Sequence, residues 1–241
     1  SAKGNYECIT TTEQLAMWVK KLETSSLFCF DTETDSLDSM QAGLVGISLC
    51  TEIGQAAYIP VAHRYPGVPT QLSWEEVSAA LKPVLENPAI HKVGQHGKYD
   101  LHVLRRHGIN VLGYTEDTML ESFVFNAGIS RHDMDTLAQK YLGYTTIKFE
   151  DVCGKGAKQI SFADVDLENA TAYAAEDADI TLRLHQVLSE RLKATPSLEK
   201  VYREIEMPLV PVLTRMEANG ILIDAVELKR QSADLTQRMH D

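Results

Sequence analysis

The sequence predicts an α/β domain, in which helices flank a mixed β-sheet, followed by a short helical segment. Three observations support this fold class. The first half alternates short apolar runs with segments of helical periodicity, the second half is mostly helical in pattern, and 44% of the 241 residues are hydrophobic. Strands followed by helices are typical of a sheet covered by helices. The hydrophobic fraction is sufficient for a sizeable core.

Four apolar runs in the first half predict strands. They lie at residues 27–30, 44–50, 56–61 and 90–94. Two helices are expected in the same half. The first covers residues 73–86, where Ser73 and Glu76 have the spacing of a capping box. The second covers residues 98–107.

Helical periodicity dominates the second half. It predicts helices at 115–126, 134–142 and 167–192, whereas residues 143–161 have no period and are expected to form a loop.

The composition shifts at residues 194–197, which predicts a boundary between a domain at 1–195 and a second part at 196–241. The second part reads as two helices separated by Asn219-Gly220 and a short apolar piece at 221–223. It is too short for a core of its own. We therefore expect it to be the beginning of a further, incomplete domain.

Charge and cysteine content restrict the class of protein. The formal net charge of −11 argues against a broad basic surface that grips duplex nucleic acid. It does not exclude an enzyme that holds a few nucleotides, because bound cations reverse the local sign. The four cysteines have no zinc spacing, and Cys29 and Cys50 are expected in the core. These features predict a reducing, cytoplasmic location, and no stretch is long and apolar enough for a signal peptide or a membrane span.

Asp31 and Glu33 directly follow the first apolar run. Their side chains share one face of the predicted strand, because strand side chains alternate with period two. The alternative is a solvated strand end without a function. Asp100 follows the strand at 90–94 and opens a helix, where an acid that simply favours the helix dipole is the competing interpretation.

A helical stripe supplies independent support for a buried acidic site. Tyr173 and Asp177 share this stripe with the apolar residues Ile180, Leu184 and Leu188. An ionised aspartate that faces inward must be paired or bound to metal, although a structural hydrogen bond to the backbone or to Tyr173 remains the alternative. Glu176 and Asp179 flank the stripe and are expected to be solvated surface acids.

Together these acids favour a hard divalent metal, because Mg²⁺ and Mn²⁺ prefer oxygen ligands. Paired metals on carboxylates are the usual machinery of phosphodiester hydrolysis. The segments Phe30–Leu37, Lys98–Asp100 and Tyr173–Asp179 resemble, in order, the three exonuclease motifs of the 3′→5′ proofreading exonuclease domain of family A DNA polymerases. The resemblance extends to residues 59–63, 117–122, 131–135 and, as the start of a polymerase portion, 205–212.

The resemblance implies an RNase H-like fold and two divalent ions, Mg²⁺ or Mn²⁺, with Zn²⁺ possible at one site. One ion would be held by Asp31, Glu33 and Asp177. The other would be bound mainly by Asp31, with Asp100 acting through water. Tyr173 and Glu33 would orient the attacking water.

Substrate contacts also follow from the resemblance. Leu37 and Phe149 match positions that pack against terminal bases, with ordinary core packing as the alternative. Gln95, Tyr99 and Arg131 match positions near the sugar–phosphate backbone, although Arg131 could instead form a surface salt bridge.

The sequence departs from the family at His96, where an asparagine is usual. Histidine is bulkier and titrates near neutrality, so binding of the terminal nucleotide is expected to differ.

The expected activity is a 3′→5′ exonuclease that acts on single-stranded or frayed DNA 3′ ends and releases 5′-mononucleotides. The remainder of a polymerase would be its partner, and no membrane is involved. Two alternatives stay open: a catalytically silent DNA-end-binding or structural domain, and an RNase D-like exoribonuclease.

Overall fold

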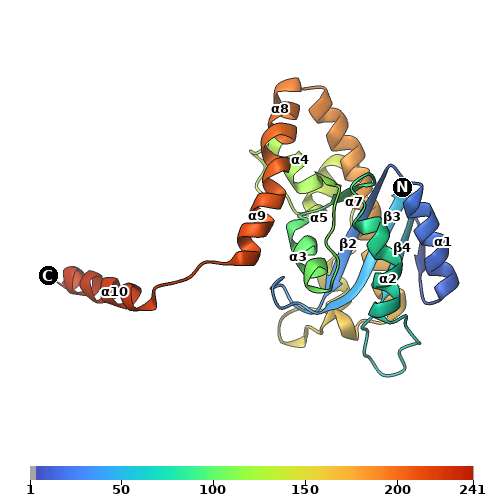
Figure 1. Cartoon of the computed structure of the whole chain (residues 1–241), viewed down its shortest axis with the longest axis horizontal. Coiled ribbons are helices and arrows are strands. Elements are labelled where there is room, and N and C mark those ends of the chain that lie inside the picture. The colour runs from blue at the N-terminus through green and yellow to red at the C-terminus, as the bar shows by residue number, and fades with distance from the viewer. Residues whose placement is uncertain (1–3, 241) are drawn as a thin grey trace.

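The computed structural model describes residues 4–240. Within them, six strands form one sheet that lies between two layers of helices (Figure 1). The strands are β1 (Asn5–Cys8), β2 (Leu27–Thr34), β3 (Leu44–Glu52), β4 (Gln55–Pro60), β5 (His91–Gly94) and β6 (Tyr114–Asp117). The helices of the first half are α1 (Thr12–Glu23), α2 (Trp74–Leu85), α3 (Lys98–Arg106) and α4 (Thr118–Phe125).

The second half is helical. Its α-helices are α5 (Met134–Leu137), α6 (Phe149–Cys153), α7 (Leu167–Lys193), α8 (Pro196–Val201), α9 (Met207–Asn219) and α10 (Ala225–His240). Short π- and 3₁₀-turns lie between them, at η1 (Ala138–Leu142), η2 (Gly156–Lys158), η3 (Phe162–Asp164) and η4 (Tyr202–Glu206).

The sheet is mixed, as expected. Its strand order is β1-β4-β3-β2-β5-β6. The hairpin strands β3 and β4 pair antiparallel, and β2 pairs antiparallel with β3 but parallel with β5. This topology places β2 in the interior of the sheet, with β5 and then β6 beside it.

Alternation along β2 assigns its side chains to the two helical layers. Phe28 and Phe30 join the core formed with α1, α2 and α3. Cys29 points to the opposite face and packs with Ala175 and Ala178 of α7. The residues that continue this second register, Asp31 and Glu33, therefore lie on the α7 face.

Most predicted elements are confirmed, including the four strands and the long helix at 167–192, which is α7. Three regions differ from the prediction. No element was predicted at β1 and α1, although Thr11 and Gln14 form a capping box at the start of α1. The helix expected at 115–126 begins only at Thr118, because Asp117 ends β6 and caps α4. The loop expected at 143–161 contains α6 and η2.

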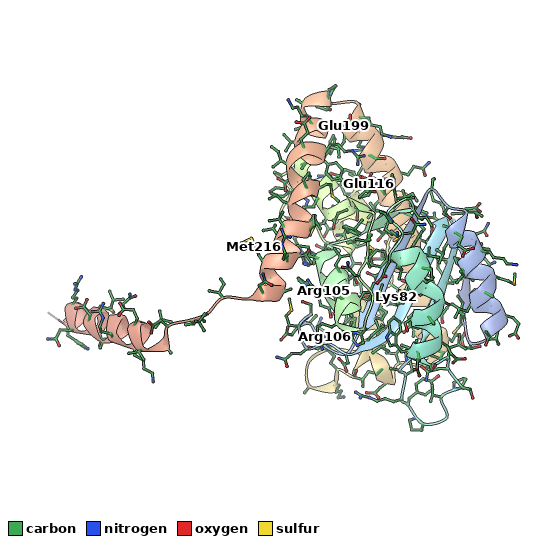
Figure 2. All side chains as sticks on the ribbon, in the orientation of Figure 1. Lys82, Arg105, Arg106, Glu116, Glu199 and Met216 are labelled. Atoms are coloured by element: carbon green, nitrogen blue, oxygen red, sulfur yellow. The ribbon has the colours of Figure 1, made fainter. Side chains whose placement is uncertain are left out.

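The helices after Thr195 differ in how they contact the sheet domain. Tyr202, Met207 and Val210 form a buried cluster with Leu192 of α7. Figure 2 shows Met216 of α9 and Arg105 of α3 on neighbouring helices. By contrast, α10 has no buried residue and extends away from the body (Figure 1). Among the described helices, none is long and apolar enough to span a membrane.

Candidate active site

The site begins where β2 ends. Asp31 is opposite Ser48 and Glu33 is opposite Gly46 in the β2–β3 ladder, and a register shift follows between Glu33 and Thr34. A larger residue at Gly46 would clash, since a Cβ there would lie 2.2 Å from the Tyr58 hydroxyl oxygen. The backbone around Glu33 is thus fixed by close packing on its antiparallel partner.

Helix α7 brings Asp177 to these two acids. Asp31, Glu33 and Asp177 each offer a carboxylate oxygen within 4.8 Å of the others. Glu33 and Asp177 are only 7% and 5% exposed, whereas Asp31 is half-buried. The Glu33 Oε1 atom is buried and has no hydrogen-bond partner among the described residues. A buried carboxylate oxygen without a partner is costly, and a cation would satisfy it.

Asp100 approaches the same acids from the first turn of α3. Its Oδ1 atom accepts a hydrogen bond from the Thr32 backbone N–H at 3.0 Å and another from the Thr32 hydroxyl. Asp100 is only 4% exposed, so it is more than a solvated acid at a helix start. Thr32 was not predicted as a functional residue, although it lies between Asp31 and Glu33 in the segment Phe30–Leu37 that carries the family resemblance.

The protonation behaviour of the cluster follows from burial and mutual repulsion. Burial, and next the charge of Asp177, raise the pKa of Asp31 to about 8. Burial and neighbouring carboxylates also raise the pKa values of Glu33 and Asp100 well above their ordinary values. For Asp177, burial and the charge of Glu176 raise the pKa in the same way. Because divalent cations favour clustered oxygen ligands, these residues fit a hard metal ion.

Tyr173 lies one helical turn before Asp177. Burial, followed by the charge of Asp177, raises the pKa of its hydroxyl, so Tyr173 is a neutral hydrogen-bond donor at physiological pH. Its ring lies 6.3 Å from the Phe149 ring and 5.7 Å from the Phe162 ring, measured between centroids. These contacts fix the tyrosine beside the acidic cluster.

The prediction for Glu176 and Asp179 was wrong, because both are buried. Helix α7 is covered on more than one side, so residues beside its stripe are also enclosed. Glu176 accepts hydrogen bonds from the Tyr144 hydroxyl and the Ile147 N–H, both at 2.6 Å. Asp179 forms an ion pair with Arg183 at 2.9 Å. These two acids are therefore structural, and their oxygens are already partnered.

A cavity of about 500 Å³ opens beside Glu33. Leu37 is 98% exposed and Phe149 is 41% exposed, and both line it, so the core-packing alternative is excluded for these two residues. The cavity has an apolar wall next to the acidic cluster. Its other lining residues include Tyr99, Gln159, Ile160 and Phe162.

The other residues predicted to contact the substrate differ in their surroundings. Tyr99 also lines the cavity and its hydroxyl donates to the Ser36 carbonyl. Gln95 donates to the His132 carbonyl at 2.8 Å. Arg131 forms the surface salt bridge that was its alternative, with Asp133 at 2.9 Å, and lies in a neighbouring cavity that shares Phe149 and Gln159.

His96 is exposed and has a positive φ of 55°. Asparagine and histidine are both enriched among residues with this backbone conformation. The two side chains therefore share a backbone role at this position, although their sizes differ.

Comparisons with known proteins show the family and the fold of the chain. The profile of a family described as 3′–5′ exonuclease matches residues 6–193. DNA polymerase I of Pseudomonas aeruginosa is 52% identical over 240 residues, which are 99% of this chain and 26% of that protein. DNA polymerase I of Rhizobium leguminosarum is 43% identical, over 96% of this chain and 24% of that protein. The chain thus spans about a quarter of the length of these relatives.

Solved structures show the same fold. The POL domain of Pol1 from M. smegmatis, in complex with DNA primer-template and dNTP, superposes with a TM-score of 0.75 and 22% identity, covering 98% of this chain and 36% of that one. Escherichia coli RNase D gives a TM-score of 0.65 with 22% identity, over 90% of this chain and 52% of that one. The fold is RNase H-like, as expected.

Proposed function

The chain belongs to the 3′–5′ exonuclease family, and from this premise we propose that it hydrolyses the terminal phosphodiester of single-stranded or frayed DNA. The products would be 5′-mononucleotides, and the activity would proofread within a DNA polymerase I. The observation that carries this proposal is the buried cluster of Asp31, Glu33 and Asp177, in which one carboxylate oxygen has no partner.

Asp31, Glu33 and Asp177 would hold one divalent ion, and the second would be bound mainly by Asp31, with Asp100 acting through water. Such ions, when bound, lower the pKa of an attacking water and stabilise the charge of the leaving 3′ oxygen. Mg²⁺ or Mn²⁺ suits this all-oxygen donor set.

The protein's own side chains prepare the reacting atoms. Tyr173 stays protonated and can donate a hydrogen bond to an attacking water, while the free oxygen of Glu33 can accept one. Thr32 holds Asp100 in place through two hydrogen bonds. Orientation of this kind lowers the barrier by removing entropic cost before the reaction.

The apolar wall of the cavity supports selection for a single-stranded end without selection for a base. Leu37 and Phe149 are exposed enough to contact unpaired bases, and stacking on such side chains tolerates any base. A chain with a net charge of −11 has little other attraction for phosphates. We therefore expect weak binding with a small salt dependence.

The proposal is tested with end-labelled single-stranded DNA incubated with Mg²⁺, Mn²⁺ or EDTA. Metal-dependent release of mononucleotides from the 3′ end is expected, and Asp31→Asn should abolish it. Metal binding without nucleotide release would instead favour a silent end-binding domain. Faster hydrolysis of a matched RNA strand would favour the exoribonuclease, which the fold likeness to RNase D keeps as the second candidate.

A further inference from the structure

The segment from Gln95 to His102 carries several proposed site residues, Asp100 among them. It connects the end of β5 to the first turns of α3. Its α3 end contacts Glu217 of α9 directly, and its β5 end contacts Asp117, which is bonded in turn to Tyr202 of η4, beyond the predicted boundary at Thr195. These contacts are polar; those at the β5 end are largely buried, whereas Glu217 is 41% exposed.

At the α3 end, a single carboxylate contacts two side chains that lie one helical turn apart. Glu217 of α9 accepts a hydrogen bond from His102 Nε2 at 2.8 Å through one oxygen and contacts Lys98 Nζ through the other. Lys98 and His102 are one turn apart, and Asp100 lies between them in sequence. The His102 side chain is only 3% exposed. A rotation or shift of this turn of α3 would break one or both contacts.

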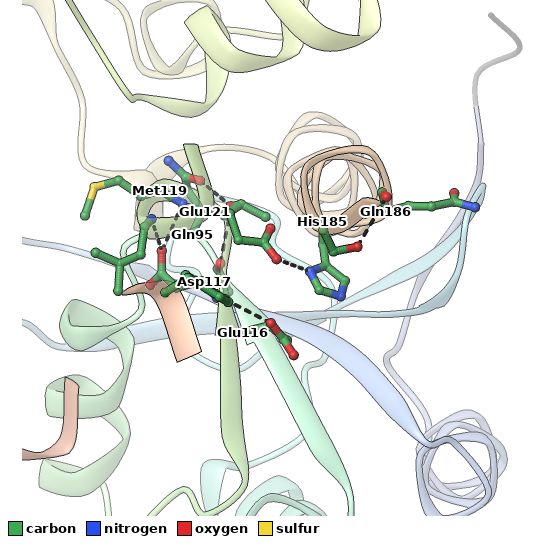
Figure 3. A network of polar contacts seen from close by, with 12 residues as sticks. Gln95, Glu116, Asp117, Met119, Glu121, His185 and Gln186 are labelled. Carbon is green, nitrogen blue, oxygen red and sulfur yellow. Dashed lines mark hydrogen bonds and ion pairs between the residues drawn. The ribbon is translucent and has the colours of Figure 1, made fainter. Parts of the chain in front are cut away.

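At the β5 end, Asp117 holds the turn that precedes α3. Its carboxylate accepts the Gly97 N–H at 2.9 Å and the His96 N–H at 3.3 Å. The Tyr114 hydroxyl donates to the same carboxylate at 2.7 Å. Figure 3 shows Asp117 beside Glu116 and close to Gln95 in this network.

A residue from η4 secures Asp117 in turn. The buried Tyr202 hydroxyl accepts the Asp117 backbone N–H at 3.0 Å and donates to Glu116 at 2.9 Å. Arg203 pairs with the same glutamate at 2.6 Å. The residues around the segment that carries Asp100 are therefore bonded to the C-terminal helices at both ends.

We propose that η4 and α9 are part of the exonuclease site, and that Glu217 is a positioning residue which holds α3 so that Asp100 meets Asp31 and Glu33. The inference rests on the proposed metal-binding function of Asp100. Glu217 itself lies outside the acidic cluster, and among the described residues its carboxylate bonds to the flanking residues Lys98 and His102. Its effect on the site is transmitted through the helix.

The test uses the whole 241-residue chain and four variants: Glu217→Ala, Glu217→Gln, Asp100→Asn and the double variant Asp100→Asn/Glu217→Ala. Mn²⁺ affinity is measured by calorimetric titration without DNA. Residues that orient metal ligands typically contribute about 10- to 100-fold. Because Glu217 acts one step further away, Glu217→Ala should weaken Mn²⁺ binding by about threefold to tenfold. Glu217→Gln keeps hydrogen-bonding atoms and should recover part of this loss.

The double variant separates positioning from a general structural effect. In the Asp100→Asn background, Glu217→Ala should cause little further loss of Mn²⁺ affinity. Amide hydrogen exchange should become faster at residues 97–103 and stay unchanged in α7. Glu204→Ala is the control, because Glu204 is exposed and its nearest cation, Lys200, lies 3.9 Å away on the neighbouring helix turn.

Equal Mn²⁺ affinity and equal exchange for Glu217→Ala and the parent would overturn the inference, as would a full additional loss in the double variant. If Glu217→Ala does not fold, the comparison of Glu217→Gln with the parent decides, with no change counting against the inference. These results are independent of hydrolysis. A parent protein that releases no nucleotide would contradict the proposed function alone.

Discussion

At the residue scale, the site is defined by charges that repel each other when no cation is present. Burial raises the pKa of Asp31, Glu33, Asp100 and Asp177, and neighbouring carboxylates raise it further, those of Glu176 and Asp135 in the case of Asp177. Such an arrangement destabilises the metal-free fold, and proteins retain it at functional sites. Removing one of these charges should therefore raise the stability of the metal-free protein while impairing its function.

We expect Asp177→Asn to stabilise the metal-free protein while abolishing nucleotide release. The amide has nearly the same shape but carries no charge, so the repulsion with Asp31 and Glu33 falls. The gain should be about 1 kcal/mol or more, because one unit of pKa displacement corresponds to about 1.4 kcal/mol. Urea unfolding in EDTA measures it, and addition of Mg²⁺ should stabilise the parent more than the variant. Lower stability than the parent in EDTA would contradict this account.

The acids and Tyr173 could be predicted from sequence because each follows a simple pattern. Asp31 and Glu33 alternate after an apolar run, and Asp177 shares a stripe with core residues. The structural partners could not be predicted in this way. Thr32, Asp117 and Glu217 act through contacts between distant segments, and no periodicity or spacing indicates which side chain each will meet, although Thr32 and Asp117 lie in segments that carry the family resemblance. Glu176 and Asp179 were misassigned for the same reason, since their partners come from other elements.

At the scale of elements, the turn between β5 and α3 is shaped by Tyr114. A Cβ at Gly97 would lie 2.0 Å from the Tyr114 hydroxyl oxygen and 2.3 Å from its Cζ. The backbone of Gly97 itself is in the ordinary right-handed region. Glycine is thus needed there for space, since this backbone conformation is open to any residue.

We expect Gly97→Ala to displace the first turn of α3. Forcing a methyl group into a packed site costs about 1–3 kcal/mol, and a misplacement of about 1 Å at a reacting group can cost about 100-fold in rate. Nucleotide release and thermal unfolding measure the two effects. Gly128→Ala is the control, because its nearest neighbour is a side-chain oxygen of Asn126 at 3.4 Å. Similar rates for the two variants would refute the steric argument.

Helices α4 and α7 are joined by a buried pair, Glu121 and His185, at 2.7 Å (Figure 3). Burial raises the pKa of Glu121 to about 7, partly offset by His185. Burial alone would lower the pKa of His185, but the hydrogen bond and charge of Glu121 outweigh it and raise the value. Glu116 and Arg203 are the next charged groups around the pair.

Both folded-state pKa values lie above their unfolded values, so the folded protein binds more protons at intermediate pH. The stabilisation is therefore fully present in acid and is lost as pH rises from about 5 to about 8. As pH rises through this range, we expect the free energy of unfolding of the parent to fall relative to that of Glu121→Gln, by up to about 1.4 kcal/mol per pH unit. Urea unfolding at four pH values measures it, and a pH-independent difference would rule the pair out as the source.

The order of elements was more predictable from sequence than their ends. Periodicity identified α7 and the strands β2 to β5, because each buries a regular apolar pattern. It failed at β6, where Asp117 belongs to a strand and caps the next helix at once. No helix was predicted at α1, although its buried residues Leu15, Trp18 and Leu22 have the i, i+3, i+7 spacing of a helix face.

At the scale of the whole molecule, the packed core extends beyond the boundary that composition indicates. Composition shifts near Thr195, yet Tyr202, Met207 and Val210 are buried against the sheet domain. Val210 in α9 is the last buried residue among those described, and beyond it the Glu217 carboxylate still contacts Lys98 and His102, whereas Ile221 and Leu222 are more than nine-tenths exposed. Stability should follow this packing.

We therefore expect the free energy of unfolding of a chain that ends at Gly220 to lie within about 1 kcal/mol of that of the 241-residue chain, since α10 contributes no buried residue. A chain that ends at Thr195 loses Tyr202, Met207 and Val210. A buried apolar side chain contributes about 1.5–3 kcal/mol, so the total loss approaches the whole stability of a typical domain, about 5–15 kcal/mol. Urea unfolding of the three chains measures these differences. Equal stability of the shortest and longest chains would show that the C-terminal helices are only attached to the exonuclease domain, and would remove the structural basis for their role in holding Asp100.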